Sequence, residues 1–270
     1  MLIYRQQCNI CKNKSLTDFA NIDHRFISRC NSCGYLFASS FDDMELSRHY
    51  KKSYYSSLND PRIDQWIDNN TAVWKGLVNT VLCYKQSPHT LLDIGSGTGG
   101  FLLKFHSQNP HTKLFAIESS LEAKKNLSKK IPSLTFPVET ADELEKLQDY
   151  YDVITLFQTL EHVYDPQKVC REVCKKLNPQ GVCIITVPNR HSYNILLGGI
   201  KRGFCFTNAT HLQFFTKYSI NKLLSTAGFS IIKRVVRFGG SNITGFKKIP
   251  QYILRRFSLS SELRYVAMKS

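Results

Sequence analysis

Short hydrophobic runs alternate with amphipathic segments over most of the chain after residue 90. Each run has the length of a buried strand, and each segment that follows has helical spacing. This alternation predicts βαβ units and a parallel sheet covered by helices on both faces. The expected strands are 90–94, 113–117, 134–138, 153–157, 182–187, 230–238 and 263–268. One helix is expected to begin at Phe101, and four more are expected at 121–130, 142–147, 167–177 and 217–227. We therefore predict an α/β fold with a seven-stranded, mostly parallel sheet.

Four cysteines dominate the segment before this alternation. They form two Cys-x-x-Cys pairs, Cys8 with Cys11 and Cys30 with Cys33, separated by 18 residues. This spacing is typical of a zinc ribbon, in which four thiolates surround one tetrahedral Zn²⁺ and leave no position for a catalytic water. The alternative is four unrelated buried cysteines. We predict a small N-terminal zinc ribbon with a structural zinc ion.

The segment between the cysteine pairs and the alternating region is expected to connect them. It is rich in Asp, Ser, Tyr and Asn, and a helical pattern of apolar residues begins near Ile63. Its tyrosines, Tyr50, Tyr54 and Tyr55, would either cover a ligand or pack between the two parts. The predicted organisation is a zinc ribbon at 1–40, a helical connector or lid at 41–89 and a large domain at 90–270.

A glycine turn follows the first expected strand. Residues 90–100 read Thr-Leu-Leu-Asp-Ile-Gly-Ser-Gly-Thr-Gly-Gly, and an apolar helix opens directly afterwards. A strand, a glycine turn and a helix N-terminus bring bare backbone N–H groups close to a nucleotide-like ligand. Gly95, Gly97, Gly99 and Gly100 satisfy both Gly-x-Gly-x-Gly and the dinucleotide pattern Gly-x-Gly-x-x-Gly.

Two acids narrow the choice of ligand. Glu118 ends the second expected strand, where a carboxylate accepts hydrogen bonds from the ribose hydroxyls of a nucleoside. Asp93 lies in the apolar end of the first strand, where a carboxylate needs a cationic or N–H partner. The amino group of a methionine moiety would supply that partner, whereas a dinucleotide pyrophosphate would repel it. The pair favours S-adenosylmethionine over NAD.

With these residues in place, the chain resembles class I S-adenosylmethionine-dependent methyltransferases, which have a Rossmann-like fold. It is most similar to the branch that contains quinone-pathway and surface-sugar O-methyltransferases, some of which carry a zinc-binding segment. The resemblance rests on the glycine motif with Asp93 and Glu118 and on three further segments: 160–166, 187–189 and 211–216.

The resemblance implies roles for individual residues. Asp93 would hold the amino group of S-adenosylmethionine, the three glycines would wrap its methionine end, and Glu118 would bind the ribose. Residues flanking the adenine or facing the methyl donor would be Thr140, Asp142, Phe157 and Gln158.

The residues that would act on the acceptor are Glu161, His162 and His211. In the quinone-type enzymes, the segment matching Glu161-His162 has a further glutamate three residues earlier, and these groups are implicated in metal binding. This chain has Gln158 there, a weaker ligand for a hard cation, which puts a catalytic Mg²⁺ in doubt. His162 as a general base and His162 as a structural hydrogen-bonding residue both stay open, as they do for His211.

Charge and composition bear on location and partners. No run of 18 apolar residues and no signal-peptide centre occurs, so we expect a cytoplasmic protein without a transmembrane segment. The net charge is +15, and residues 233–270 hold nine Lys or Arg against one acid, Glu262. This basic segment would bind a phosphorylated acceptor or the surface of an anionic membrane, or form a solvated face.

The sequence therefore predicts a methyltransferase that acts on an oxygen of a sugar, a nucleotide-sugar or a quinol-like molecule. One alternative is an RNA methyltransferase that uses the zinc ribbon and the basic surface to hold phosphates. Another is a non-catalytic adaptor that retains the methyltransferase fold. NAD-linked oxidoreduction is the least favoured hypothesis, because Asp93 would repel the pyrophosphate of NAD.

Overall fold

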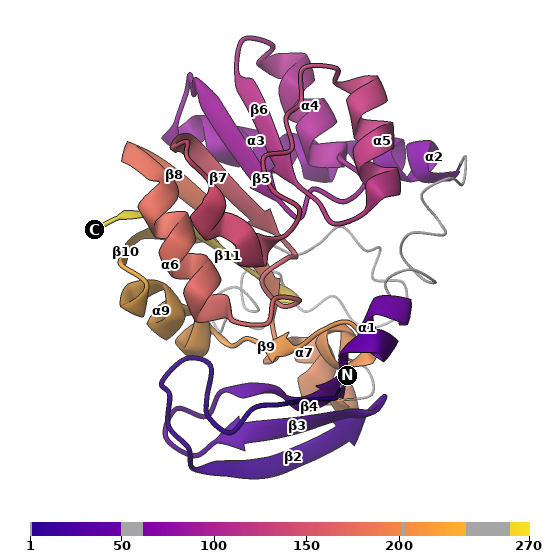
Figure 1. Cartoon of the computed structure of the whole chain (residues 1–270), viewed down its shortest axis with the longest axis vertical. Coiled ribbons are helices and arrows are strands. Elements are labelled where there is room, and N and C mark those ends of the chain that lie inside the picture. The colour runs from indigo at the N-terminus through magenta and orange to yellow at the C-terminus, as the bar shows by residue number, and fades with distance from the viewer. Residues whose placement is uncertain (1, 50–61, 201–202, 236–259) are drawn as a thin grey trace.

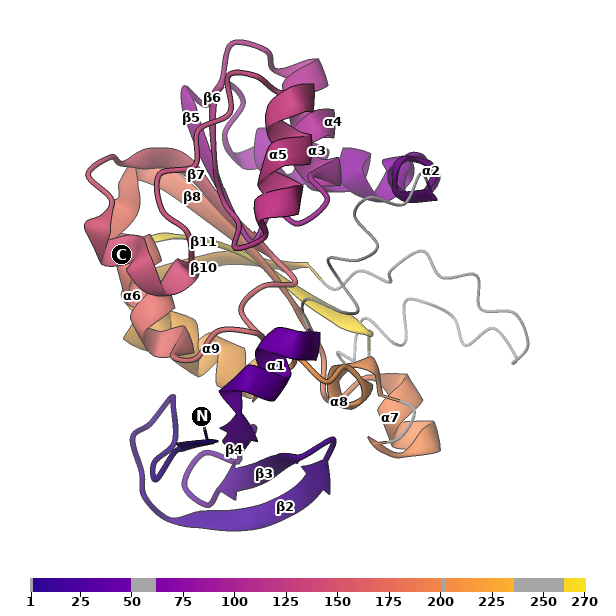
Figure 2. The same ribbon diagram turned by 45° about the vertical axis from the view of Figure 1, so that its right-hand side comes forward.

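Two β-sheets organise the computed structural model, which describes residues 2–49, 62–200, 203–235 and 260–270 (Figures 1 and 2). A small sheet lies at the N-terminal end, and a larger one carries helices on both faces. Tyr50, Tyr54 and Tyr55, and most of the basic segment 233–270, lie outside the described residues. In the part of the chain that is described, no helix combines the length and the hydropathy needed to cross a bilayer.

The larger sheet has the strand order β10-β11-β8-β7-β5-β6. Strands β5, β6, β7 and β8 run parallel to their neighbours among themselves, whereas β11 is antiparallel to both β8 and β10. This arrangement confirms the predicted Rossmann-like, mostly parallel sheet, and the structure adds that the last strand is inserted antiparallel between β8 and β10. The bounds are β5 Thr90–Ile94, β6 Lys113–Ile117, β7 Tyr151–Phe157, β8 Leu177–Pro188, β10 Phe229–Val235 and β11 Glu262–Lys269.

The predicted third strand, 134–138, is not a strand of this sheet. Only Thr135 bridges to β6, where its N–H donates to Leu114 O and its carbonyl accepts from Ala116 N. Pro137 follows two residues later and has no N–H to continue the ladder. The described sheet therefore has six strands where the sequence predicted seven.

Helices cover both faces of the larger sheet, and alternate residues of β5 show why. Leu91 packs into the core cluster on the side of α3 and α4, whereas Leu92 packs into the cluster on the side of α6 and α9. The bounds are α2 Arg62–Asn69, α3 Thr71–Tyr84, α4 Gly100–Gln108, α5 Leu121–Lys130, η2 Ala141–Lys146, α6 Pro166–Lys176 and α9 Lys217–Thr226. The predicted helices therefore form, with ends shifted by a residue or two, and 142–147 is a 3₁₀ helix.

The N-terminal sheet is antiparallel and has the order β1-β4-β3-β2. Its strands are β1 Leu2–Tyr4, β2 Leu16–Ile22, β3 Arg25–Cys30 and β4 Leu36–Asp42, and α1 (Asp43–His49) follows. A fifth strand, β9 (Gln213–Phe214), comes from the late part of the chain and pairs with β4 through Leu36 and Phe37. The segment before β9, residues 189–210, contains two short helices, α7 Tyr193–Gly198 and α8 Phe204–Thr207. The division of the chain at residues 40 and 89 stays a prediction.

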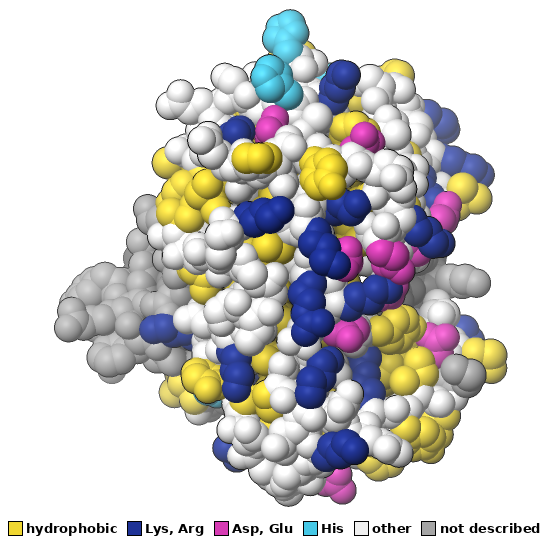
Figure 3. Space-filling model, turned by 60° about the vertical axis from the view of Figure 1, so that its left-hand side comes forward, with side chains coloured by type: hydrophobic (Ala, Val, Ile, Leu, Met, Phe, Trp, Pro, Cys, Tyr) yellow, Lys and Arg dark blue, Asp and Glu magenta, His cyan; other side chains and the backbone are white. Residues whose placement is uncertain are grey.

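Lysine and arginine side chains run down the face formed by α6 and its surroundings, and Asp and Glu side chains lie among them (Figure 3). On α6, Lys168 pairs with Glu145 at 3.0 Å and Lys175 with Glu172 at 2.7 Å. These lysines are matched by carboxylates, as expected of a solvated helix face.

Candidate active site

A cavity of roughly 850 Å³ opens at the carboxyl ends of the parallel strands β5, β6 and β7. In open α/β sheets this edge is where ligands bind. The cavity wall includes every predicted cofactor and acceptor residue except Gly99: Asp93, Gly95, Gly97, Glu118, Thr140, Asp142, Phe157, Gln158, Glu161, His162 and His211. The structure thus brings together residues that span more than a hundred positions in the sequence.

At two positions of the glycine turn, steric constraints explain why the residue is glycine. Gly95 has φ +76°, and a Cβ there would meet the side chain of Thr159 at 2.4 Å. Gly99 has φ +77°, and its Cβ would meet Leu127 of α5 at 1.9 Å. Gly99 therefore lies under the turn and lets α5 pack against it, which explains why it does not line the cavity.

Asp93 is buried at the end of β5, where the Thr155 hydroxyl donates to its Oδ1 at 2.6 Å. Burial, together with the nearby charge of Glu118, raises the pKa of Asp93 to about 7, although the Thr155 hydrogen bond opposes this shift. A cationic group in the cavity would stabilise the ionised form. This environment suits the predicted contact with an amino group.

Glu118 is buried directly after β6 and holds the glycine turn in place. Its two carboxylate oxygens accept from the backbone N–H groups of Gly97 and Ser120, both at 2.8 Å. Burial raises the pKa of Glu118, whereas these backbone donors lower it. The side chain is therefore fixed at the position expected for the ribose of a nucleoside.

The remaining predicted cofactor residues come from the segment between α5 and β7 and from the end of β7. Thr140 caps η2 in a capping box with Glu143, and Asp142 follows in the first turn. Gln158 has φ +54°, and its amide donates to Glu262 Oε2 at 3.2 Å and to Thr186 Oγ1 at 3.3 Å. This backbone conformation is uncommon for a residue with a side chain and turns the chain sharply at the end of β7.

Glu161, His162 and His211 form a second cluster in the cavity wall, with Glu161 and His211 buried and His162 partly buried. Their ligand atoms lie within 4.8 Å of one another, and His211 Nε2 is 4.0 Å from Glu161 Oε1. Neither carboxylate oxygen of Glu161 has a hydrogen-bond partner in the described structure. Burial raises the pKa of Glu161 well above its ordinary range, lowers the pKa of His162 to about 4 and lowers that of His211 well below its usual value.

Two backbone segments meet to form this cluster. The carbonyl of Glu161 accepts from the N–H groups of Leu212 at 2.8 Å and Gln213 at 3.0 Å. These bonds place His211 beside the loop that carries Glu161 and His162. The sequence predicted each residue separately, and the contact between them is a finding of the structure.

The N-terminal sheet holds the same two segments through Gln213. The amide of Gln213 donates to Val163 O at 2.7 Å, and its Oε1 accepts from the Tyr35 hydroxyl at 2.7 Å and from Asn9 Nδ2 at 3.2 Å. Gln213 and Tyr35 are both almost completely buried. The N-terminal sheet and the cavity wall therefore share one buried hydrogen-bond network.

Arg25 of β3 reaches across to the segment that carries His211. Its Nη1 donates to the carbonyls of Asn208 and His211, both at 2.7 Å, and its Nη2 donates to Phe206 O at 3.0 Å. Burial lowers the pKa of Arg25, and the half-exposed Asp23 opposes that shift. The sequence gave no sign of this contact, because one arginine among many has no spacing that marks it.

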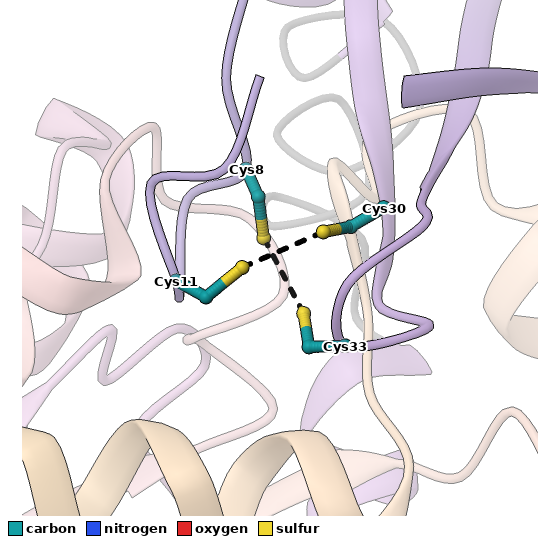
Figure 4. Close-up of side chains that lie close together, drawn as sticks. All are labelled: Cys8, Cys11, Cys30 and Cys33. Carbon is teal, nitrogen blue, oxygen red and sulfur yellow. Dashed lines mark hydrogen bonds between the residues drawn. The ribbon is translucent and has the colours of Figure 1, made fainter. Parts of the chain in front are cut away.

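The four predicted metal ligands converge at one end of the N-terminal sheet (Figure 4). Cys8 Sγ lies 3.6 Å from Cys33 Sγ, and Cys11 Sγ lies 3.5 Å from Cys30 Sγ. Tetrahedral Zn²⁺ with Zn–S bonds of about 2.3 Å places its sulfur ligands roughly 3.8 Å apart. The cluster therefore fits the predicted zinc ribbon, and it lies outside the cavity wall.

Trp74 and Arg264 also line the cavity, and the sequence predicted neither as a site residue. A Cβ on Gly100 would meet the Trp74 indole at 2.6 Å, so the fourth glycine makes room for this ring. Trp74 belonged to the apolar pattern of the expected connector helix, which could not distinguish a ring facing the core from one facing a ligand.

Glycines beneath a ligand cavity, an acid after the second parallel strand and an antiparallel last strand define the class I methyltransferase fold. The family model described as a methyltransferase domain matches residues 66–234, more than half of the chain. The chain therefore belongs to the family of methyltransferase domains. The predicted enzyme class, an S-adenosylmethionine-dependent methyltransferase, is confirmed at this level.

Similar proteins with assigned functions include ubiquinone biosynthesis O-methyltransferases. The chain is 37% identical to that of Shewanella sp. (strain ANA-3) over 60 residues, which are 22% of this chain and 25% of the relative. It is 28% identical to that of Rickettsia canadensis (strain McKiel) over 152 residues, which are 52% of this chain and 62% of the relative. The chain thus spans less than two thirds of either relative.

Solved structures share the fold. A chain in the complex between the Haloferax volcanii Trm112 methyltransferase activator and a putative methyltransferase superposes with a TM-score of 0.62 at 16% identity, covering 80% of this chain and 97% of that chain. The N-methyltransferase NodS from Bradyrhizobium japonicum WM9, in complex with S-adenosyl-L-homocysteine, superposes with a TM-score of 0.54 at 14% identity, covering 84% and 97%.

Proposed function

We propose that the chain transfers a methyl group from S-adenosylmethionine to an oxygen atom of a small-molecule acceptor. The acceptor would be a sugar, a nucleotide-sugar or a quinol-like compound. The observation that carries this proposal is one cavity whose wall includes both the residues proposed to bind the donor and the cluster of Glu161, His162 and His211. Its volume of roughly 850 Å³ is within the range of sites that bind small molecules and cofactors.

The donor side would be formed by residues whose environments have been described. Asp93 would bind the amino group of S-adenosylmethionine, Glu118 would bind the ribose, and Thr140 with Asp142 would flank the adenine. Phe157 and Gln158, at the end of β7, would face the methyl group. When bound, S-adenosylmethionine supplies an electrophilic methyl group on a sulfonium.

On the acceptor side, the protein must bring the attacking oxygen to within about 3–3.5 Å of the methyl carbon and align it. A hydroxyl is a weak nucleophile and must lose its proton during or before the displacement. His162 and Glu161 border the space where this oxygen would lie, and His211 supports them. Since burial holds the pKa of His162 near 4, an unaided imidazole there is a weak base.

The cysteine cluster would hold a structural zinc ion. Four thiolates occupy all positions of a tetrahedral ion, so the ion would supply stability to the two knuckles and no chemistry to the cavity. Its effect would be to fix Asn9 and Tyr35, which bind Gln213 at the back of the acceptor side. The zinc ribbon would thus support the shape of the site.

A labelling experiment tests the proposed function. The purified protein is incubated with isotopically labelled S-adenosylmethionine and cell extract, and the labelled product is identified by mass spectrometry. A labelled O-methyl group on a small molecule supports the proposal. Label in RNA, with an affinity that falls steeply as salt rises, would favour the RNA methyltransferase instead.

Calorimetric titration with S-adenosylmethionine provides the second test. Failure of the folded protein to bind the donor would favour the adaptor hypothesis, in which the fold is retained without chemistry. Two lysines of α6, Lys168 and Lys175, give the RNA hypothesis no specific support, because each is paired with a glutamate.

A further inference from the structure

The cluster of Glu161, His162 and His211 contains a buried carboxylate that the protein itself leaves without a partner. Glu161 is completely buried, and both of its carboxylate oxygens lack a hydrogen-bond donor in the described structure. An acceptor-only group in this position is costly unless a cation or a proton satisfies it. The side chain lines the cavity, so a ligand can reach it.

The two histidines are held with one particular nitrogen turned toward backbone carbonyls. His162 Nδ1 lies 3.0 Å from Thr210 O, and His211 Nδ1 lies 3.0 Å from Cys205 O. Because a carbonyl oxygen only accepts, Nδ1 carries the proton in both rings and Nε2 carries the lone pair. Metal-binding histidines are oriented in this way, with the second ring nitrogen donating to a carbonyl or carboxylate.

The three ligand atoms lie close enough together to approach one ion. Two ligands bound to one tetrahedral ion at about 2.1 Å lie roughly 3.4 Å apart. His211 Nε2 and Glu161 Oε1 are 4.0 Å apart, and all three ligand atoms lie within 4.8 Å of one another. A bound ion would therefore draw these side chains closer together than they lie in this structure.

The type of ligand decides which ion fits. The Mg²⁺ implied by the quinone-type enzymes needs several oxygen ligands, and the residue at the place of their additional glutamate is Gln158, which bonds to Glu262 and Thr186. His211 completes the cluster instead, and this gives two imidazoles and one carboxylate. The residues present do not fit Mg²⁺, whereas two histidines and one carboxylate are a typical set for divalent transition metals.

We propose that Glu161, His162 and His211 form a binding site for a divalent transition-metal ion, separate from the four-cysteine cluster. Three protein ligands leave coordination positions open toward the cavity, where hydroxyl oxygens of the acceptor would bind. The role toward the acceptor rests on the proposed function, but the metal site itself does not, because it uses residues other than those assigned to the donor.

A titration with Co²⁺ tests the site in protein that carries one zinc ion per chain, bound by the four cysteines, without S-adenosylmethionine. The four thiolates bind Zn²⁺ more tightly than Co²⁺, so added Co²⁺ leaves the cysteine cluster occupied by zinc. The expected result is one equivalent of Co²⁺ with visible absorption bands and no thiolate-to-cobalt charge-transfer band. Mg²⁺ in excess should not displace it.

Three variants make the assignment specific. Glu161→Gln keeps the shape of the side chain and His211→Ala removes one imidazole, and each should weaken Co²⁺ binding by at least about tenfold. His191→Ala is the matched control, because His191 is exposed and lies outside the cavity wall, and it should bind Co²⁺ as the wild type does. Calorimetric binding of S-adenosylmethionine verifies that each variant retains a folded donor side.

Three results would overturn the metal site: no second metal in the wild type, unchanged Co²⁺ affinity in both Glu161→Gln and His211→Ala, or ready displacement by Mg²⁺. If the wild type binds S-adenosylmethionine and takes up no Co²⁺, the metal site fails and the proposed function stands. If it takes up Co²⁺ and does not bind S-adenosylmethionine, the proposed function fails and the metal site stands.

Discussion

Replacement of Arg25 by methionine tests whether the N-terminal sheet positions the acceptor side of the cavity. The guanidinium of Arg25 crosses from β3 to the chain segment before β9 and donates to three carbonyls there, those of Phe206, Asn208 and His211. Methionine has a similar length and no donor. The substitution therefore removes the hydrogen bonds and leaves most of the packing in place.

The magnitude follows from what is left behind. The Asn208 carbonyl keeps a second donor, His211 N–H at 3.2 Å, whereas those of Phe206 and His211 lose the donor described for them. A buried acceptor that loses its partner costs about 1–3 kcal/mol. Since a buried guanidinium no longer has to be desolvated, part of this cost is offset. We expect a loss of about 2–4 kcal/mol and a melting temperature lower by roughly 5–15 °C.

The assay compares Arg25→Met with Arg29→Met by thermal denaturation, donor binding and acceptor kinetics. Arg29 lies on the same strand and is exposed, so its substitution should change stability by no more than about 0.5 kcal/mol. Arg25→Met should bind S-adenosylmethionine with unchanged affinity, because Asp93 and Glu118 belong to the other sheet, and it should methylate the acceptor more slowly. Equal stability and equal turnover of the two variants would refute the positioning role of Arg25.

Three other outcomes are expected. Burial raises the pKa of Asp93 to about 7. The folded protein without ligand therefore keeps a proton on this group that the unfolded chain loses above about pH 4. The stability that this proton contributes is complete below about pH 4 and is lost as the pH rises to 7. In urea denaturation at pH 8, Asp93→Asn should therefore be more stable than the wild type. Calorimetry should show that this variant binds S-adenosylmethionine more weakly. The affinity of the wild type for S-adenosylmethionine should rise from pH 6 to pH 8. Gly99→Ala should lower the free energy of unfolding in urea by about 2–4 kcal/mol, because the new Cβ would collide with Leu127 at a residue with a positive φ. The control Gly34→Ala should lower it by only about 1 kcal/mol, because Gly34 also has a positive φ, +67°, but no atom lies closer than 4.0 Å to the new Cβ. Cys30→Ser should release zinc, measured by elemental analysis, and destabilise the N-terminal sheet. The control Cys83→Ser, at an exposed cysteine, should change neither the zinc content nor the stability. Retention of one zinc ion per chain in Cys30→Ser would contradict the zinc ribbon.

The residues assigned to the donor side could be predicted as neighbours because the information there is local. The glycine turn, Asp93 and Glu118 lie at the ends of two adjacent strands, and the conformations that they require can be inferred from residue type and spacing. The cysteine pairs are local in the same sense, since each pair forms one tight turn. The structure places these residues as predicted, with Gly99 beneath the cavity rather than in its wall.

The failures have a physical cause as well. The predicted strand 134–138 has the apolar pattern of a strand, but Pro137 removes a donor and the pairing stops at one bridge. The contacts of Arg25 and Gln213 join positions more than 170 residues apart, and no pattern in a single sequence encodes them. Gln158, at the place of the additional glutamate of the quinone-type enzymes, has a positive φ and bonds to Glu262 and Thr186, a network that no sequence pattern indicates.

These long-range contacts show that different parts of the chain form the proposed donor side and the proposed acceptor side of the cavity. The donor side depends on β5, β6 and the turns that follow them. The acceptor side depends on a segment that ends in β9, which pairs with β4 of the N-terminal sheet and leads into α9 of the larger one. His211 lies two residues before β9, so a shift of that strand pairing moves the histidine relative to Glu161. The N-terminal sheet can thus change which acceptor fits without changing how the donor binds.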